Sequence, residues 1–271
     1  MKKAQVSLIQ MNIDFGKKEK NLKKAEILLE KASHQADPSI PHLACLPELF
    51  STGYDLKNVQ KHAEIIPSGK TTKILQNLAI KFSTGIMASL MEKTDKEYYN
   101  TAIFINEKGK FQGRYRKIHL FPLDPMDERP FFSTGGFELP KTFFKTNFGK
   151  VGLLICFDLR FPELSRRIVL EGAEILIYLA EFPNPRSEIW KRLLQARAME
   201  NQIFVCGVNR VGIDPTETSF FGKSLVYDPN GNLIVEGSDR EEVLTISLNP
   251  ETVKKAKKIL DAFEHRKPNF Y

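Results

Sequence analysis

The chain has 271 residues, of which 42% are hydrophobic, and it carries 40 lysines and arginines against 33 aspartates and glutamates. This length and composition suit a large globular domain and exclude an intrinsically disordered chain, a collagen-like rod and a small disulfide-stapled scaffold. The net charge of +7 raises the question of a nucleic-acid partner. The densest basic runs, 17–24 and 254–258, have no interleaved aromatic residues for base stacking. We therefore interpret them as solvated helix faces and expect no nucleic-acid partner.

Apolar periodicity predicts the elements of the first half of the chain. Segments with apolar residues at helical spacing indicate helices over 17–35 and 71–81. Short apolar runs indicate strands at 6–9, 42–46, 85–90, 101–105 and 110–116. The last two flank Glu107-Lys108-Gly109, which is typical of a hairpin turn.

The second half begins with a long loop rich in proline and glycine, 118–141, and loops of this length are usually functional. Strands are predicted at 151–155, 175–179, 203–208, 225–227, 233–235 and 243–248, and helices from Pro162 to near Gly172, over 187–200 and after 250. The alternation predicts one α/β domain over 1–271, with a mixed sheet or two sheets covered by helices, and with a C-terminal helix and tail at about 250–271.

Several common signatures are missing. Ser68-Gly69-Lys70-Thr71 resembles the end of a phosphate-binding loop, but the required earlier glycine is Glu64. There is no dinucleotide fingerprint and no serine-nucleophile elbow, and the five histidines are too scattered for a zinc site. The N-terminal apolar stretch is short and interrupted, and no run approaches the roughly 20 apolar residues of a membrane span. We expect a cytoplasmic protein with no metal and no membrane partner.

Cys156 occupies a position where a thiol can be reactive. It follows the apolar run 151–155 and precedes the helix that begins at Pro162, so it would lie at the carboxyl edge of the sheet. Amides at the start of that helix would stabilise a thiolate and the oxyanion formed when it attacks a carbonyl. Cys45 and Cys206 lie inside apolar runs and are interpreted as buried structural residues. From its position alone, Cys156 could be either kind.

A cysteine that hydrolyses an amide also needs a base, an acid and a cation for the oxyanion. His119 is the histidine in a promising loop, but it has no evident partner. Glu48 and Lys117 stand at the ends of two predicted strands, where a carboxylate and an ammonium could meet the thiol. Taken separately, each is more simply interpreted as a surface charge.

Three segments together resemble the carbon-nitrogen hydrolase (nitrilase) superfamily. They are Leu-Pro-Glu at 46–48, Arg-Lys-Ile-His-Leu-Phe at 116–121 and Cys-Phe-Asp-Leu-Arg-Phe-Pro-Glu at 156–163, and the similarity runs from residue 4 to about 250. The resemblance implies a four-layer αββα sandwich that forms a homodimer or a higher homo-oligomer. It implies no metal or organic cofactor.

The resemblance also assigns roles. It implies that Cys156 is the nucleophile, Glu48 the general base and Lys117 the cation that holds the tetrahedral intermediate. Glu128 matches a second glutamate that orients the lysine or the substrate, and the backbone amide of Phe157 would complete the oxyanion site.

The segment 156–162 is similar to omega-amidases and deaminated-glutathione amidases, which act on small linear amides bearing a distant carboxylate. Arg160 would clamp that carboxylate or form a salt bridge at a dimer face. Tyr54, Phe182 and Trp190 would wall the pocket or simply pack in the core.

The expected activity is release of ammonia from an omega-monoamide of a dicarboxylic 2-oxo acid. An N-carbamoyl amine or amino-acid hydrolase, a nitrilase and a catalytically silent scaffold are the alternatives. Phe157, Ile189 and Lys223 stand where relatives more often have tyrosine, histidine and histidine, which leaves the substrate open.

Overall fold

Two six-stranded sheets lie face to face in the computed structural model, which describes residues 1–136 and 143–270. The predicted loop over 118–141 and the predicted C-terminal tail both extend outside the described residues, at 137–141 and at Tyr271. Aromatic rings meet between the sheets, with the Phe104 and Phe144 centroids 5.8 Å apart. Strands buried on both faces explain the continuous apolar runs of the sequence.

The first sheet has the strand order β14-β1-β2-β3-β4-β5. Strands β1, β2 and β3 pair in parallel, and the other pairs are antiparallel. The bounds are β1 Ala4–Gln10, β2 His42–Cys45, β3 Gly85–Lys93, β4 Tyr98–Ile105, β5 Phe111–Arg116 and β14 Glu242–Leu248.

The second sheet has the order β13-β12-β9-β8-β7-β6, with β7, β8 and β9 in parallel. The bounds are β6 Phe143–Lys145, β7 Lys150–Ile155, β8 Ile175–Leu179, β9 Phe204–Val208, β12 Leu225–Tyr227 and β13 Leu233–Glu236. A separate two-stranded sheet joins β10 Val211–Ile213 to β11 Ser219–Phe221.

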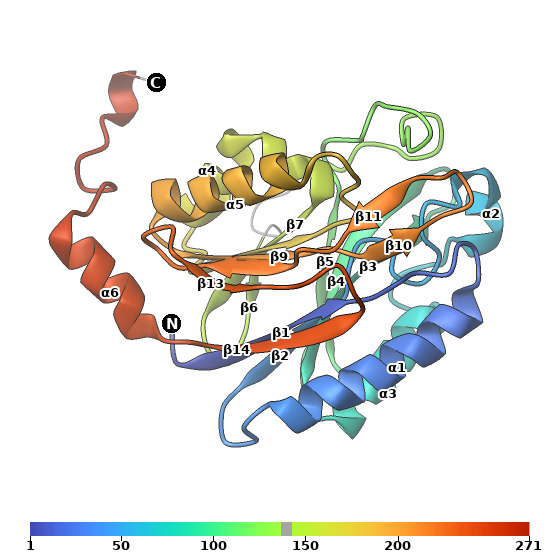
Figure 1. Cartoon of the computed structure of the whole chain (residues 1–271), viewed down its shortest axis with the longest axis horizontal. Coiled ribbons are helices and arrows are strands. Elements are labelled where there is room, and N and C mark those ends of the chain that lie inside the picture. Colours follow the sequence, from blue (N-terminus) through green and yellow to red (C-terminus); the bar gives the residue numbers. More distant parts are fainter. Residues whose placement is uncertain (137–142, 271) are drawn as a thin grey trace.

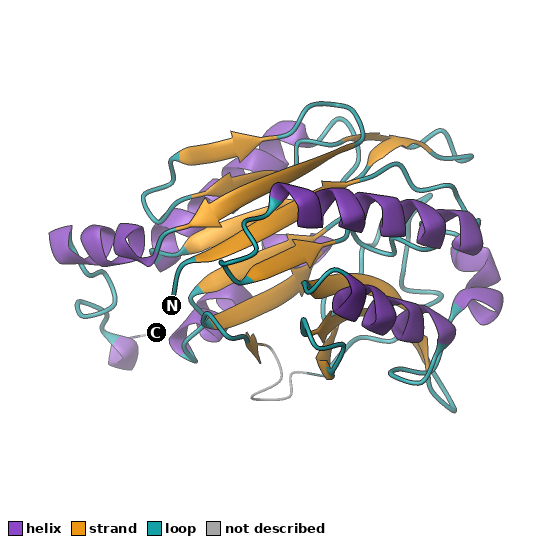
Figure 2. Ribbon diagram, turned by 90° about the horizontal axis from the view of Figure 1, so that it is seen from below, coloured by secondary structure: helices purple, strands orange, loops and turns teal. Residues whose placement is uncertain are grey.

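Helices cover the outer faces of both sheets (Figures 1 and 2). Helices α1 (Lys18–Gln35) and α3 (Lys70–Lys81) lie on the first sheet, and α4 (Pro162–Leu170) and α5 (Ser187–Asn201) on the second. Helix α1 buries its apolar face, including Leu22, Ala25, Leu28, Leu29 and Ala32, the residues whose spacing predicts it. The predicted four-layer αββα sandwich is thus confirmed.

Helix α6 (Pro250–Ile259) projects from the body of the protein near the N-terminus (Figure 1). Within the described residues, no helix combines the length and apolar character that crossing a lipid bilayer requires.

The structure adds elements that apolar periodicity did not predict. Strands β6, β10 and β11 have three residues each, too few for a recognisable alternation. The short helices η1 (Leu56–Asn58) and α2 (Val59–His62) fall in a segment without periodic apolar residues. The 3-10 turn η2 (Cys156–Arg160) separates β7 from α4, so the amides nearest to Cys156 belong to this turn and not to α4.

Candidate active site

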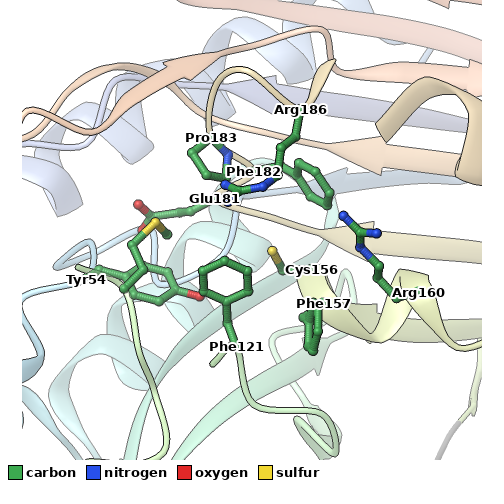
Figure 3. Close-up of a pocket in the computed structure, with 10 residues that line it drawn as sticks. Tyr54, Phe121, Cys156, Phe157, Arg160, Glu181, Phe182, Pro183 and Arg186 are labelled. Carbon is green, nitrogen blue, oxygen red and sulfur yellow. The ribbon is translucent and has the colours of Figure 1, made fainter. Parts of the chain in front are cut away.

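The ends of three strands bring Glu48 and Lys117 beside Cys156, and Cys156 lines a pocket. Glu48 follows β2 of the first sheet, Lys117 directly follows β5 at its edge, and Cys156 directly follows β7 of the second sheet. The lining of this pocket includes Tyr54, Phe121, Cys156, Phe157, Arg160 and Phe182 (Figure 3).

Lys117 lies between two carboxylates. Its Nζ donates to Glu48 Oε1 at 2.8 Å and to Glu128 Oε2 at 2.6 Å, and all three side chains are fully buried. The Nδ2 group of Asn100 also donates to both carboxylates, at 2.8 Å each. One ammonium and one amide therefore hold the two acids together.

The charges in this cluster set the protonation of the lysine. Burial alone would lower the pKa of Lys117, but Glu128 and Glu48 outweigh it and raise that pKa above its usual range. Burial and the neighbouring Glu48 raise the pKa of Glu128, against the lowering effect of Lys117. Lys117 therefore stays an ammonium at neutral pH.

Both oxygens of Glu48 are fixed. Tyr54 Oη donates to Oε1 at 2.9 Å, and the backbone N–H of Glu181 donates to Oε2 at 2.9 Å. Glu181 itself lines the pocket, and its Oε2 accepts from Arg210 Nη1 at 2.7 Å. Burial raises the pKa of Glu181 to about 8, although Arg210 opposes the shift. Oε2 of Glu48, which receives fewer donors than Oε1, is the freer oxygen to accept a proton.

Cys156 begins the turn η2 with a φ of 41°, a backbone conformation that non-glycine residues seldom adopt. The buried carboxylate of Asp158 fixes this turn: its Oδ2 accepts from the N–H of Ile155 at 3.1 Å and from Tyr115 Oη at 2.8 Å. Its Oδ1 accepts from the backbone N–H of His119 at 3.1 Å and lies 2.8 Å from His119 Nδ1. Strain at a turn persists where the surroundings hold it, and such positions cluster at active sites.

His119 does not act on the thiol as a base in this geometry. Its ring hydrogen-bonds to Asp158 and stacks on Phe161, with the ring centroids 3.5 Å apart. It supports the turn that carries Cys156.

The prediction of a stabilised thiolate is wrong. Burial and the Glu48 carboxylate hold the pKa of Cys156 well above its usual range and outweigh the lowering effect of Lys117. The side chain is 5% exposed and faces two carboxylates, which disfavour a second negative charge. The resting form is a thiol, so its proton must be removed as it attacks.

The other two cysteines fit their prediction. Cys45 and Cys206 are buried in the core and free of disulfide bonds. Burial raises the pKa of Cys206 to about 12 and that of Cys45 well above its usual range. Neither thiol is primed for reaction.

The remaining predicted site residues divide into two groups. Arg160, at the end of η2, is exposed and lines the pocket, as do Tyr54 and Phe182. Trp190 is fully buried behind Phe182, with ring centroids 5.2 Å apart, so its interpretation as core is correct.

Several residues of the site were not predicted from the sequence. Asn100, Asp158 and Glu181 are buried polar residues within or beside apolar runs, and that pattern is a weak signal for a site. Arg186, Phe121, Met126 and Pro183 come from loops that line the pocket. Residues 1–136 and 143–270 hold no group of three or more His, Cys, Asp or Glu side chains arranged for a metal ion.

Comparisons with known proteins agree on one family. Residues 5–258 match the family model described as carbon-nitrogen hydrolase. The chain is 35% identical to the 2-oxoglutaramate amidase of Bacillus subtilis (strain 168), over 98% of each chain. It is 31% identical to the omega-amidase NIT3 of Saccharomyces cerevisiae, over 99% of this chain and 95% of that one.

Solved structures give the same picture. Nit3 from Saccharomyces cerevisiae, a member of branch 10 of the nitrilase superfamily, superposes with a TM-score of 0.88 at 30% identity, over 96% of this chain and 95% of that chain. XC1258 from Xanthomonas campestris, a CN-hydrolase superfamily protein with an arsenic adduct in its active site, gives 0.89 at 27% identity, over 98% of each chain.

Proposed function

The chain belongs to the carbon-nitrogen hydrolase family, and we propose that it is an omega-amidase that hydrolyses the terminal amide of a small linear 2-oxo acid. Its relatives include amidases, and the protein is a carbon-nitrogen hydrolase. The observation that carries the proposal is the buried Glu48–Lys117–Glu128 cluster beside Cys156, whose thiol lines a pocket that also contains an arginine.

In the first half of the reaction, Cys156 Sγ attacks the amide carbon as Glu48 takes the thiol proton. The high pKa of Cys156 requires this coupling, because little thiolate exists beforehand. The carbonyl oxygen becomes an oxyanion near the Lys117 ammonium and the backbone N–H of Phe157. The proton then passes to the leaving nitrogen, the C–N bond breaks, ammonia departs and a thioester remains.

In the second half, water replaces ammonia. Glu48 accepts a proton from the water as the water oxygen attacks the thioester carbon. The C–S bond then breaks, and Glu48 returns the proton to the sulfur, which gives the acid and the restored thiol. Glu128 holds Lys117 in place throughout by accepting from its ammonium, and Asn100 holds Glu48 by donating to its carboxylate. The net change is the conversion of an amide and water to a carboxylic acid and ammonia.

The substrate proposal rests on the relatives named 2-oxoglutaramate amidase and omega-amidase and on Arg160. The guanidinium of Arg160 can bind both oxygens of a carboxylate at the far end of a linear amide. The aromatic residues between it and the thiol would hold the carbon chain.

Ammonia release tests the proposal over a panel of a five-carbon 2-oxo acid omega-amide, an N-carbamoyl amino acid and an aliphatic nitrile. We expect the highest kcat/KM for the omega-amide and complete loss of turnover in Cys156→Ala with the melting temperature retained. Arg160→Lys should mainly raise KM. A preference for the carbamoyl compound or the nitrile would replace the proposed activity, and no turnover together with no labelling of Cys156 by an electrophile would favour a silent scaffold.

We further propose that the protein acts in the cytoplasm as a homodimer, on the strength of the family resemblance. Light scattering on the purified protein should then give a mass of about twice 31.0 kDa. A mass of one chain at micromolar concentration would contradict the dimer.

A further inference from the structure

A second guanidinium lines the pocket beside that of Arg160. Arg186 lies in the loop between β8 and α5, directly before the first residue of α5. Its side chain descends into the pocket from this loop, and Arg160 reaches in from the turn that carries Cys156 (Figure 3). Two cationic groups from different elements thus face the same space.

Neither guanidinium has a hydrogen bond or an ion pair with any residue in the described parts of the chain. The contact that Arg186 makes is with the face of the Phe121 ring, 5.7 Å from its centroid. The acid that lines the same pocket, Glu181, is already paired with Arg210 at 2.7 Å. Two like charges beside one pocket repel each other, and an anion bound between them would remove that repulsion.

The rest of the pocket indicates the shape of that anion. The thiol lies beside the Lys117 cluster, and Phe121, Phe157 and Phe182 line the space with apolar surface. A ligand that reaches from the thiol to the arginines is therefore linear, with an apolar middle and a negative far end. A carboxylate accepts up to about four hydrogen bonds, enough for both guanidinium groups.

We propose that Arg186 forms an anion subsite together with Arg160 and is a specificity-determining residue for substrates with a distal carboxylate. The proposal rests on the proposed amidase function for its substrate class. In this proposal the two arginines bind one carboxylate together.

Binding of glutarate, a five-carbon dicarboxylate, to the Cys156→Ala protein tests the subsite without turnover. Isothermal titration should show that Arg186→Gln raises the Kd about tenfold or more, the loss expected for a charge-assisted hydrogen bond. Arg186→Lys should restore part of the affinity. Arg192→Gln is the matched control, because this arginine lies on the exposed face of α5 and pairs with Glu188 at 3.8 Å, away from the pocket. An unchanged Kd in Arg186→Gln would overturn the proposal.

Steady-state kinetics of the protein with intact Cys156 distinguishes a binding role of Arg186 from a purely structural one. For the omega-amide with a carboxylate, Arg186→Gln should raise KM about tenfold and leave kcat within about threefold. For a neutral amide of the same length, kcat/KM should stay unchanged. Equal losses for both amides would mean that Arg186 only holds the Phe121 loop, and would refute the subsite.

The two proposals fail separately. If the wild-type enzyme hydrolyses no omega-amide, the glutarate titration still decides whether the arginines bind a carboxylate. If Arg186→Gln binds glutarate as tightly as its parent while the wild type hydrolyses the omega-amide, the subsite is lost and the amidase remains.

Discussion

Asp158 is the residue whose replacement tests most directly how the fold holds the cysteine. The substitution Asp158→Asn keeps the size of the side chain and removes one acceptor oxygen. In the wild type, one carboxylate oxygen serves Ile155 and Tyr115, and the other serves the backbone and ring of His119. The new NH₂ group must face one of these pairs of donors.

The cost follows from which pair it faces. Towards Tyr115, the hydroxyl can rotate and accept from the amide, so the N–H of Ile155 is left unpaired. Towards His119, the ring can change tautomer and accept, and the backbone N–H is left unpaired. Either orientation leaves one backbone N–H without an acceptor, which costs roughly 1–3 kcal/mol of the free energy of unfolding. For a chain of this size we expect the melting temperature to fall by several degrees.

The activity should fall further than the stability suggests. Ile155 directly precedes Cys156, and His119 bonds to the carboxylate that fixes the turn on which the φ of 41° at Cys156 depends. A small displacement of a nucleophile can cost roughly a hundredfold in rate. We expect kcat/KM for ammonia release to drop about tenfold to a hundredfold at a temperature where the variant is folded. Asp228→Asn is the control, because Asp228 caps a surface turn through three hydrogen bonds. Wild-type activity and stability in Asp158→Asn would refute the reasoning.

Three further substitutions follow from the site. Lys117→Met leaves two buried carboxylates facing each other, so we expect no ammonia release and a loss of roughly 3–5 kcal/mol in chemical denaturation; retained activity would contradict this. Tyr54→Phe removes one of three donors to Glu48 Oε1 and should lower kcat about fivefold with little change in melting temperature, whereas wild-type kinetics would show that the hydroxyl is dispensable. The pKa of Glu181 is raised from its ordinary value of 4.5 to about 8 in the folded protein. The protonated carboxyl therefore contributes its whole share of the free energy of unfolding below pH 4.5, and this contribution declines by up to roughly 1.4 kcal/mol per pH unit as the pH rises towards 8. Glu181→Gln should lack this decline in melts between pH 5 and 9, and parallel curves for the two proteins would refute it.

Local patterns were sufficient for most of the secondary structure. Strand β8 and strand β12 begin and end where their apolar runs do, and α1 differs from its prediction by one residue. Burial against a sheet imposes a period on the sequence, and that period is visible within a few turns of chain. Strands β6, β10 and β11 left no such trace, because their place depends on partners elsewhere in the chain.

Polar positions of the site were harder to predict. Asn100 contacts Glu48, 52 residues away in sequence, and Asp158 contacts His119 across 39 residues. Nothing next to these residues in the chain indicates such contacts. Arg186 stands in a loop beside prolines and a serine, and its sequence context does not reveal that it lacks an acidic partner.

The sequence by itself determined most strands and helices, because burial against a sheet imposes a period on the apolar residues, and its resemblance to a known family indicated the four layers and the candidate acid, ammonium and thiol. The tertiary structure alone decided that Cys156 is a thiol and that Arg160 and Arg186 face one pocket. Protonation and charge pairing depend on burial and on neighbours brought together by folding, and neither quantity is encoded in the residues adjacent along the chain.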